Sequence, residues 1–223
     1  MNPYPKEDRE GAYPGSTSNT EDREGAHTVF FIGKPGCGKG TQAKLLSQAT
    51  GWTVISAGRQ FREIAALDTR VGRKIKSEIE AGLLAPHWFA MYLFQKALFA
   101  LPDGASVIFD GFNRKLPEAE LILESLSWLA RPFSIFDIRI SDEEVHRRLA
   151  ARKETDGRQD DTVVGKRLKE YYAHTEPAVE TFRRAGVLID IQGEQLPEQV
   201  ARDIRAAFAQ VSSETHPVVR RSL

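Results

Sequence analysis

The sequence predicts an α/β fold, in which a parallel sheet is covered by helices on both faces. Three observations lead to this prediction. Short apolar runs of strand length alternate with longer runs of helical length along residues 27–211. The first apolar run leads directly into a glycine-rich turn that opens a helix. The chain of 223 residues is long enough for one hydrophobic core with one or two small inserts.

The expected elements follow from these runs and from the residues that interrupt them. Strands are expected at residues 27–32, 52–55, 106–109, 133–140 and 187–191. Helices are expected at residues 39–49, 59–100, 117–129, 142–153, 162–185 and 197–210. The second helical stretch should break near Leu67-Asp68, Gly82 and Pro86, and a polar loop should cross residues 154–161. In such folds ligands bind at the carboxyl ends of the strands, where we expect the site.

Composition excludes several classes of protein. Lys and Arg together number 31, as do Asp and Glu, so the net charge of zero does not suggest a nucleic-acid or membrane-surface binder. The single cysteine, Cys37, excludes an internal disulfide framework and a four-cysteine zinc site, and it fits a reducing cytoplasm. The apolar runs are too short to span a bilayer, and no secretory signal is visible. We expect a monomeric cytoplasmic protein with no nucleic-acid or membrane partner.

The two ends of the chain differ from its middle. Residues 1–26 are rich in charged and small polar residues, and the segment 7–12 returns unchanged as 21–26. This composition cannot bury enough apolar surface to order itself, so a disordered N-terminal tail is expected at 1–26. A loose C-terminal tail is expected at 212–223, which leaves one domain at 27–211.

A glycine-rich segment follows the first strand and reads Gly33-Lys34-Pro35-Gly36-Cys37-Gly38-Lys39-Gly40-Thr41. Its glycines let backbone N–H groups converge on a phosphate, and the N-terminus of the following helix adds partial positive charge. Lys39 supplies a point charge for the β- and γ-phosphates of ATP. A strand, this loop and a helix in this order predict the three-layer fold of P-loop NTPases.

This loop departs from the general pattern in one informative way. Gly40 stands where Ser or Thr is usual, and Thr41 comes next. The variant resembles the loop of the adenylate kinase family, and the resemblance extends over about residues 28–208. It implies a helical insert that binds the acceptor monophosphate at about 56–85, and a lid at about 152–161 that is too short for zinc. It also implies phosphoryl transfer from ATP to a nucleoside monophosphate, with AMP giving two ADP.

The resemblance assigns roles residue by residue. Segment 110–114, Asp-Gly-Phe-Asn-Arg, resembles the family's Asp-Gly-Phe-Pro-Arg, and four arginines at 148, 152, 158 and 167 match those of the lid region, although about two residues are missing before the last. The implied ATP-binding residues are Gly36, Cys37, Gly38, Lys39, Gly40, Thr41, Arg148 and Arg152. The implied acceptor-binding residues are Ser56, Ala57, Arg62, Leu83, Leu84, Ala85, Gly111, Arg114, Glu118, Arg158 and Arg167. The implied catalytic residues are Lys39, Arg114, Arg152, Arg158 and Arg167.

A magnesium ion is the expected cofactor. Asp110 ends the third strand near the phosphate loop, and a single carboxylate there suits Mg²⁺ held through water. The competing interpretation is that Asp110 only forms the turn before Gly111. No zinc is expected.

Three residues depart from the family pattern on the acceptor side. Relatives specific for AMP carry Gln at the position of Glu118 and Thr at that of Ala57, whereas pyrimidine monophosphate kinases have Ala at the latter. A carboxylate accepts hydrogen bonds but cannot donate one to adenine N1, so Glu118 either shifts the acceptor base, is protonated, or faces solvent. Asn113 replaces the proline. The alternatives are therefore a kinase for UMP, CMP or another monophosphate, a kinase for a small non-nucleotide acceptor, or a nucleotide-binding module without turnover.

Overall fold

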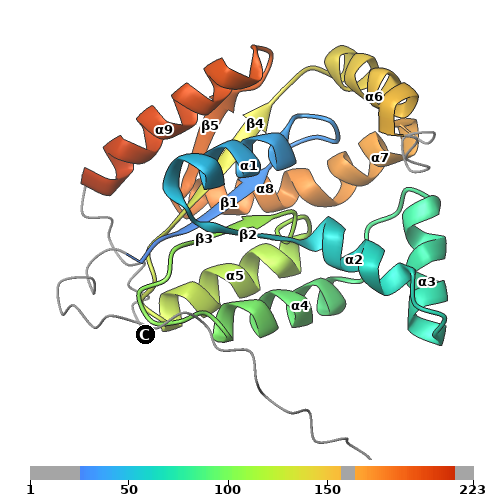
Figure 1. Cartoon of the computed structure of the whole chain (residues 1–223), viewed down its shortest axis with the longest axis horizontal. Coiled ribbons are helices and arrows are strands. Elements are labelled where there is room, and N and C mark those ends of the chain that lie inside the picture. The colour runs from blue at the N-terminus through green and yellow to red at the C-terminus, as the bar shows by residue number, and fades with distance from the viewer. Residues whose placement is uncertain (1–25, 157–163, 214–223) are drawn as a thin grey trace, which may run out of the picture.

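A five-stranded parallel sheet forms the centre of the computed structural model, which describes residues 26–156 and 164–213 (Figure 1). The strands are β1 (Thr28–Ile32), β2 (Thr53–Ser56), β3 (Val107–Asp110), β4 (Phe133–Arg139) and β5 (Leu188–Gln192), in the spatial order β2-β3-β1-β4-β5. All four neighbouring pairs are parallel. The predicted fold class is confirmed, and the observed strand bounds lie within one residue of those expected.

The helices also follow the expected order. They are α1 (Lys39–Thr50), α2 (Ala57–Ala65), α3 (Arg70–Glu80), α4 (His87–Phe99), α5 (Leu116–Trp128), α6 (Asp142–Asp156), α7 (Val164–Glu170), α8 (Glu176–Arg184) and α9 (Pro197–Ser213). The long helical stretch predicted at 59–100 divides into α2, α3 and α4 near the expected breaks. Within the described ranges, no helix combines the length and apolar character needed to cross a membrane.

One helix differs from its prediction. A single helix was expected at 162–185, but the five residues Tyr171–Thr175 form a π-helical turn, η3, between α7 and α8. Pro177 stands in the first turn of α8. Proline has no N–H to donate and its ring clashes with the carbonyl four residues earlier, here that of Ala173. A wider π-helical turn at this point accommodates that clash without ending the helix.

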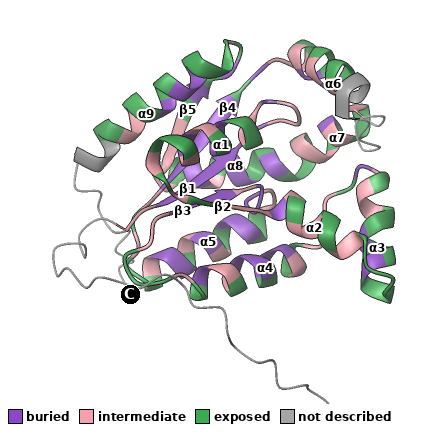
Figure 2. Cartoon of the chain, viewed as in Figure 1, coloured by how far each residue is buried: buried purple, intermediate pink, exposed green. Residues whose placement is uncertain are grey.

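Each face of the sheet has its own hydrophobic core (Figure 2). Along β1, Phe30 and Ile32 join the cluster made with α4, α5 and α8, whereas Val29 and Phe31 join the cluster made with α1, α6 and α9. Successive strand residues point to opposite faces, so a strand that is apolar throughout must be covered on both sides. Each fully buried side chain of this size contributes about 1.5–3 kcal/mol to folding.

The helices α2 and α3 extend beyond the sheet, toward one side of the molecule (Figure 1). They fall within the segment predicted as the acceptor-binding insert, residues 56–85. The N-terminus of α3 is capped by Thr69, whose Oγ1 accepts a hydrogen bond from the Gly72 N–H at 2.9 Å. Gly72 allows α3 to approach the end of α2, since a Cβ atom there would lie 2.2 Å from the Leu67 carbonyl oxygen.

The sheet topology also determines where a ligand can bind. The chain runs from β1 to β2 and β3 on one side of the sheet, and then to β4 and β5 on the other. The loops after β1 and β4 therefore separate at this reversal and leave a crevice at the carboxyl ends of the strands.

Candidate active site

A cavity of about 830 Å³ lies at the carboxyl ends of β1, β2 and β3. The end of β1 and the phosphate loop form its floor, together with Ser56 and Asp110 at the ends of the next two strands. Residues of α2, of the segment 82–85 and of the loop before α5 line one side, and residues of α6, α7 and η3 line the other. The cavity thus lies between the predicted insert on one side and the helices α6 and α7 with η3 on the other.

The phosphate loop, residues 33–41, has a backbone that only glycine permits at its start. Gly33 has a φ of 136°, and a Cβ atom there would lie 2.5 Å from the Ile138 carbonyl oxygen. Lys39 Nζ donates to the carbonyl oxygens of Gly33 at 2.7 Å and Lys34 at 2.8 Å, which holds the ammonium within the loop. No described side chain caps the start of α1, so its first N–H groups are available to an anion.

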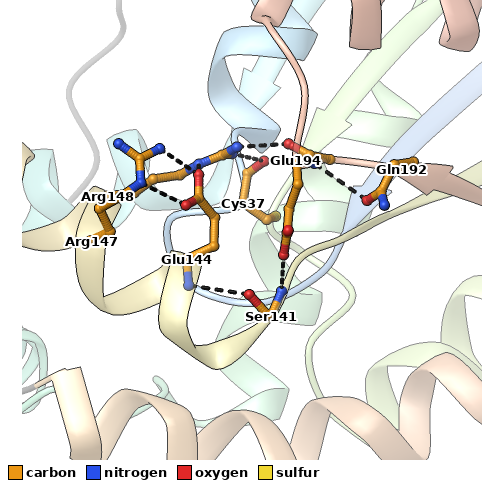
Figure 3. Close-up of polar contacts among 8 residues, drawn as sticks. Cys37, Ser141, Glu144, Arg147, Arg148, Gln192 and Glu194 are labelled. Atoms are coloured by element: carbon orange, nitrogen blue, oxygen red, sulfur yellow. Dashed lines mark hydrogen bonds and ion pairs between the residues drawn. The ribbon is translucent and has the colours of Figure 1, made fainter.

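Arg148 of α6 braces this loop (Figure 3). Its guanidinium donates to the Cys37 carbonyl oxygen at 3.3 Å and to the Gly193 carbonyl oxygen at 2.7 Å, and so links the loop to the end of β5. Glu144 accepts from Arg148 Nε at 2.6 Å and also from Arg147. The hydrogen bond from Arg147, together with the smaller effect of the one from Arg148, lowers the pKa of the Glu144 carboxyl to about 2. The carboxylate is therefore ionised at neutral pH and keeps Arg148 oriented toward the loop.

Asp110 and Ser56 meet at the floor of the cavity. They are register partners at the ends of β3 and β2, and Ser56 Oγ donates to Asp110 Oδ2 at 3.2 Å. The same carboxylate oxygen lies 3.7 Å from the position that a Cβ atom on Gly40 would take. Asp110 is thus within a few ångströms of the helix that follows the phosphate loop, as its predicted role requires.

Glu118 organises the loop that joins β3 to α5. Its Oε2 accepts from the N–H groups of Arg114 at 2.6 Å and Lys115 at 3.1 Å, which satisfies backbone donors at the start of the helix. The side chain lines the cavity, yet the residue is only 3% exposed. Burial raises the pKa of the Glu118 carboxyl to about 7, although the two N–H donors act in the opposite direction. The interpretation that Glu118 faces solvent is excluded.

Arg114 lies beside this loop, and its guanidinium folds over Gly111. A Cβ atom on Gly111 would meet Arg114 Nη2 at 2.7 Å, so the absence of a side chain leaves room for the arginine. Gly111 also has a φ of 83°, a conformation that glycine adopts without strain. Both residues line the cavity.

The charge of the cavity is strongly positive although the chain has no net charge. Among the lining residues, eight are Lys or Arg and three are Asp or Glu. The cations are Lys39, Lys44, Arg59, Arg62, Arg114, Arg148, Arg152 and Arg167, and the acids are Asp110, Glu118 and Glu170. Positive charge focused in a concave site raises the local concentration of anions, so this cavity is suited to a ligand with several phosphates.

Comparison with known proteins agrees with this geometry. The family model for adenylate kinase matches residues 31–187. An adenylate kinase of Thermus thermophilus is 37% identical over 183 residues, which cover 81% of this chain and 96% of the relative. The chain belongs to the adenylate kinase family. An adenylate kinase of Maricaulis maris is 33% identical over 81% of this chain and 97% of the relative. One of Prochlorococcus marinus is 34% identical over 82% of this chain and 97% of the relative.

Membership of the adenylate kinase family establishes the class of reaction. The chain is a nucleoside monophosphate kinase, a phosphotransferase that binds ATP. The prediction from the phosphate loop and its variant Gly40-Thr41 is confirmed at this level. Family membership therefore excludes one of the predicted alternatives, the kinase for a small non-nucleotide acceptor.

The structure brings most of the predicted site residues to one cavity. Those that line it are Gly36, Gly38, Lys39, Gly40, Thr41, Ser56, Arg62, Leu83, Leu84, Ala85, Asp110, Gly111, Arg114, Glu118, Arg148, Arg152 and Arg167. Ala57 and Cys37 are not among the residues that line it; they are 1% and 2% exposed and pack in the two hydrophobic cores. Arg158 and half of the predicted lid, residues 157–161, lie outside the described residues, as do residues 1–25 and 214–223. Residues 212 and 213 continue α9 rather than beginning a tail.

The sequence analysis did not assign five of the lining residues to the site, namely Lys44, Arg59, Glu170, Tyr171 and Thr175. Helical spacing could have found three of them. Lys44 stands four residues after Gly40 on α1, and Arg59 stands three residues before Arg62 on α2. Glu170 stands three residues after Arg167 on α7, so each of the three shares a helix face with a predicted residue. Tyr171 and Thr175 belong to η3, which no pattern in the sequence indicated.

Proposed function

We propose that the chain transfers the γ-phosphate of ATP to AMP and so forms two ADP. The observation that carries this proposal is that the phosphate loop and the acceptor-side arginines line one cavity. ATP and AMP together bring five to six phosphate-borne negative charges, and a cavity with eight cations is complementary to them. The adenylate kinases named above support AMP as the acceptor.

On the ATP side, the chain supplies positioning rather than covalent chemistry. The N–H groups at the start of α1 and the Lys39 ammonium hold the β- and γ-phosphates. Arg148 keeps the loop in this shape through the Cys37 carbonyl, and Arg152, one helical turn further on α6, reaches the same anion. Because these groups are in place beforehand, little reorganisation accompanies the reaction.

On the acceptor side, Arg62 and Arg114 bind the phosphate of the monophosphate. They line the cavity from α2 and from the loop after β3. Two arginines on separate elements fix both the position and the orientation of the attacking oxygen, which is most of what an in-line transfer requires. Arg167 on α7, with Arg158, closes over the transferring group and stabilises the charge that spreads over it.

The described residues fit a magnesium ion that arrives with ATP. They hold no cluster of three or more His, Cys, Asp or Glu that could form a dedicated metal site. Mg²⁺ keeps several waters and is commonly bound by one or two carboxylates and the substrate phosphates, so Asp110 suffices. Bound Mg²⁺ supplies neutralising charge on the β- and γ-phosphates.

The test is a coupled assay with ATP and Mg²⁺ and a panel of AMP, CMP, UMP and GMP. We expect kcat/KM for AMP to exceed that for each of the others at least tenfold. A preference for UMP or CMP would support the alternative that Ala57 suggested. No turnover with any of the four, in a protein that still binds ATP, would indicate a nucleotide-binding module. The monomeric state and the cytoplasmic location stay predictions.

A further inference from the structure

Asn113 carries a buried side chain whose polar atoms are unsatisfied. The residue is 0% exposed and belongs to the wall of the cavity. Neither its Oδ1 nor its Nδ2 finds a hydrogen-bond partner among the described residues. Buried polar atoms are nearly always hydrogen-bonded, and a buried donor or acceptor without a hydrogen bond destabilises the folded protein. An unsatisfied carboxamide on the wall of a binding cavity points to a partner that arrives with the ligand.

Glu118 is hydrogen-bonded to the backbone next to Asn113, and both residues line the cavity. Glu118 Oε2 accepts the N–H of Arg114 at 2.6 Å, and that N–H belongs to the peptide that joins Asn113 to Arg114. The preceding residue, Phe112, is anchored in the core against the rings of Phe94 and Phe109. The backbone that carries the carboxamide is therefore fixed from both sides, so a new hydrogen bond of the carboxamide requires rotation of the Asn113 side chain alone.

The two side chains offer complementary hydrogen-bonding groups. Glu118 Oε2 already accepts two N–H groups, which leaves Oε1 as the oxygen for a ligand. An ionised carboxylate can only accept a hydrogen bond, whereas the carboxamide of Asn113 provides an N–H donor as well. The edge of adenine presents an amino donor beside the N1 acceptor. It needs one acceptor and one donor from the protein, and the pair provides both.

We infer that Asn113 is a specificity-determining residue of the acceptor site, whose carboxamide turns into the cavity and donates to N1 of adenine while Glu118 Oε1 accepts from the amino group. The inference rests on the proposed function, because it takes AMP as the acceptor. Rotation of one side chain is required, since both amide atoms are covered before the acceptor binds. Asn113 supplies the donor that a carboxylate at position 118 lacks.

A double-mutant cycle tests this assignment. Gln at position 118 would provide donor and acceptor by itself, so Glu118→Gln should make Asn113 dispensable. AMP affinity is measured by calorimetry at pH 8 for the native protein, Asn113→Leu, Glu118→Gln and the double variant. Leucine matches asparagine in shape and removes both polar atoms. We expect Asn113→Leu to weaken AMP about tenfold in the native background and less than about twofold in the Glu118→Gln background.

Two controls keep the result interpretable. ATP affinity should stay within about twofold in every variant, because the Asn113 carboxamide has no hydrogen-bond partner and Glu118 accepts only from Arg114 and Lys115 among the described residues, outside the phosphate loop. Ser125→Ala is the second control. Ser125 is another buried polar residue, which lies on α5 and does not line the cavity, so its replacement should leave AMP affinity unchanged. If Asn113→Leu does not fold, as judged by thermal melting, Asn113→Ala takes its place in the cycle.

The outcomes separate cleanly. Unchanged AMP affinity in Asn113→Leu would overturn the inference, as would an equal loss in both backgrounds, which would mean that Asn113 only supports the fold or holds a buried water. Stronger binding of CMP, UMP or GMP than of AMP by the native protein would also overturn it. Absence of turnover in a native protein that binds both nucleotides would overturn the proposed function alone and leave this inference about AMP binding standing.

Discussion

Replacing the buried carboxyl of Glu118 by an amide should stabilise the protein above neutral pH and not below pH 5. The pKa of Glu118 rises from 4.5 to about 7 on folding because the side chain is desolvated. Between these values the folded state binds more protons than the unfolded state, so stability falls as the pH rises through this window. At pH 8 the ionised carboxylate lowers the free energy of unfolding by about 3 kcal/mol, and Glu118→Gln removes this destabilisation. Gln Oε1 can still accept the N–H groups of Arg114 and Lys115.

Urea unfolding of the native protein and of Glu118→Gln at pH 5 and pH 8 measures this effect. We expect the free energy of unfolding of the variant to exceed that of the native protein by about 3 kcal/mol at pH 8 and by less than about 1 kcal/mol at pH 5, with equal m values. Glu120→Gln is the matched control, since Glu120 is exposed on the same helix. The same difference between native and variant at both pH values would refute the reasoning, because it could not arise from ionisation of Glu118.

Four further predictions concern the site and its supports. Lys39→Ala should lower kcat by about a hundredfold to a thousandfold in a protein that still folds; full activity in the folded variant would contradict the role of the phosphate loop. Arg114→Ala should weaken AMP by about 1.5–3 kcal/mol and ATP much less, as separate titrations would show, and a larger loss for ATP would refute the acceptor-side assignment. Deletion of residues 1–25 should leave kcat and KM unchanged in a steady-state assay; a large loss in a folded truncation would make the tail part of the site. Gly72→Ala should lower stability by about 1–3 kcal/mol and raise KM for AMP, because its Cβ would lie 2.2 Å from the Leu67 carbonyl oxygen; no change in either would show that α2 and α3 adjust freely.

The fold was predictable because its signals are local and mutually consistent. Val29 to Ile32 are apolar at every position, which marks a strand buried on both faces, and the glycines after it mark a loop that a side chain would obstruct. Breaks at Gly82 and Pro86 separated the helices correctly. The one misjudged helix carries Pro177, and whether proline ends, kinks or widens a helix depends on what packs around it.

The site was predictable where a motif fixes the backbone, and less so where it depends on packing. Lys39 and Arg114 belong to the segments that follow the carboxyl ends of β1 and β3, so their approach to one cavity follows from the parallel sheet. The brace between Arg148 and the Cys37 carbonyl joins residues 111 positions apart in sequence, which no local pattern indicates. Ala57 was expected at the acceptor but is buried, because it begins α2 with its side chain toward the core.

The π-helical turn η3 carries a consequence for insertions and deletions. An α-helix turns by about 100° per residue, and a π-helical turn accommodates about one residue more than an α-helical one. Loss of a single residue within Tyr171–Thr175 would return the turn to α-helical geometry, with a kink where the Pro177 ring meets the carbonyl four residues before it. The side chains of α7 would then rotate by roughly a quarter of a turn relative to α8. Arg167 and Glu170 would then leave the cavity wall, and Leu168 of the same helix would leave the hydrophobic core, so a single deletion would alter both the site and the packing that supports it.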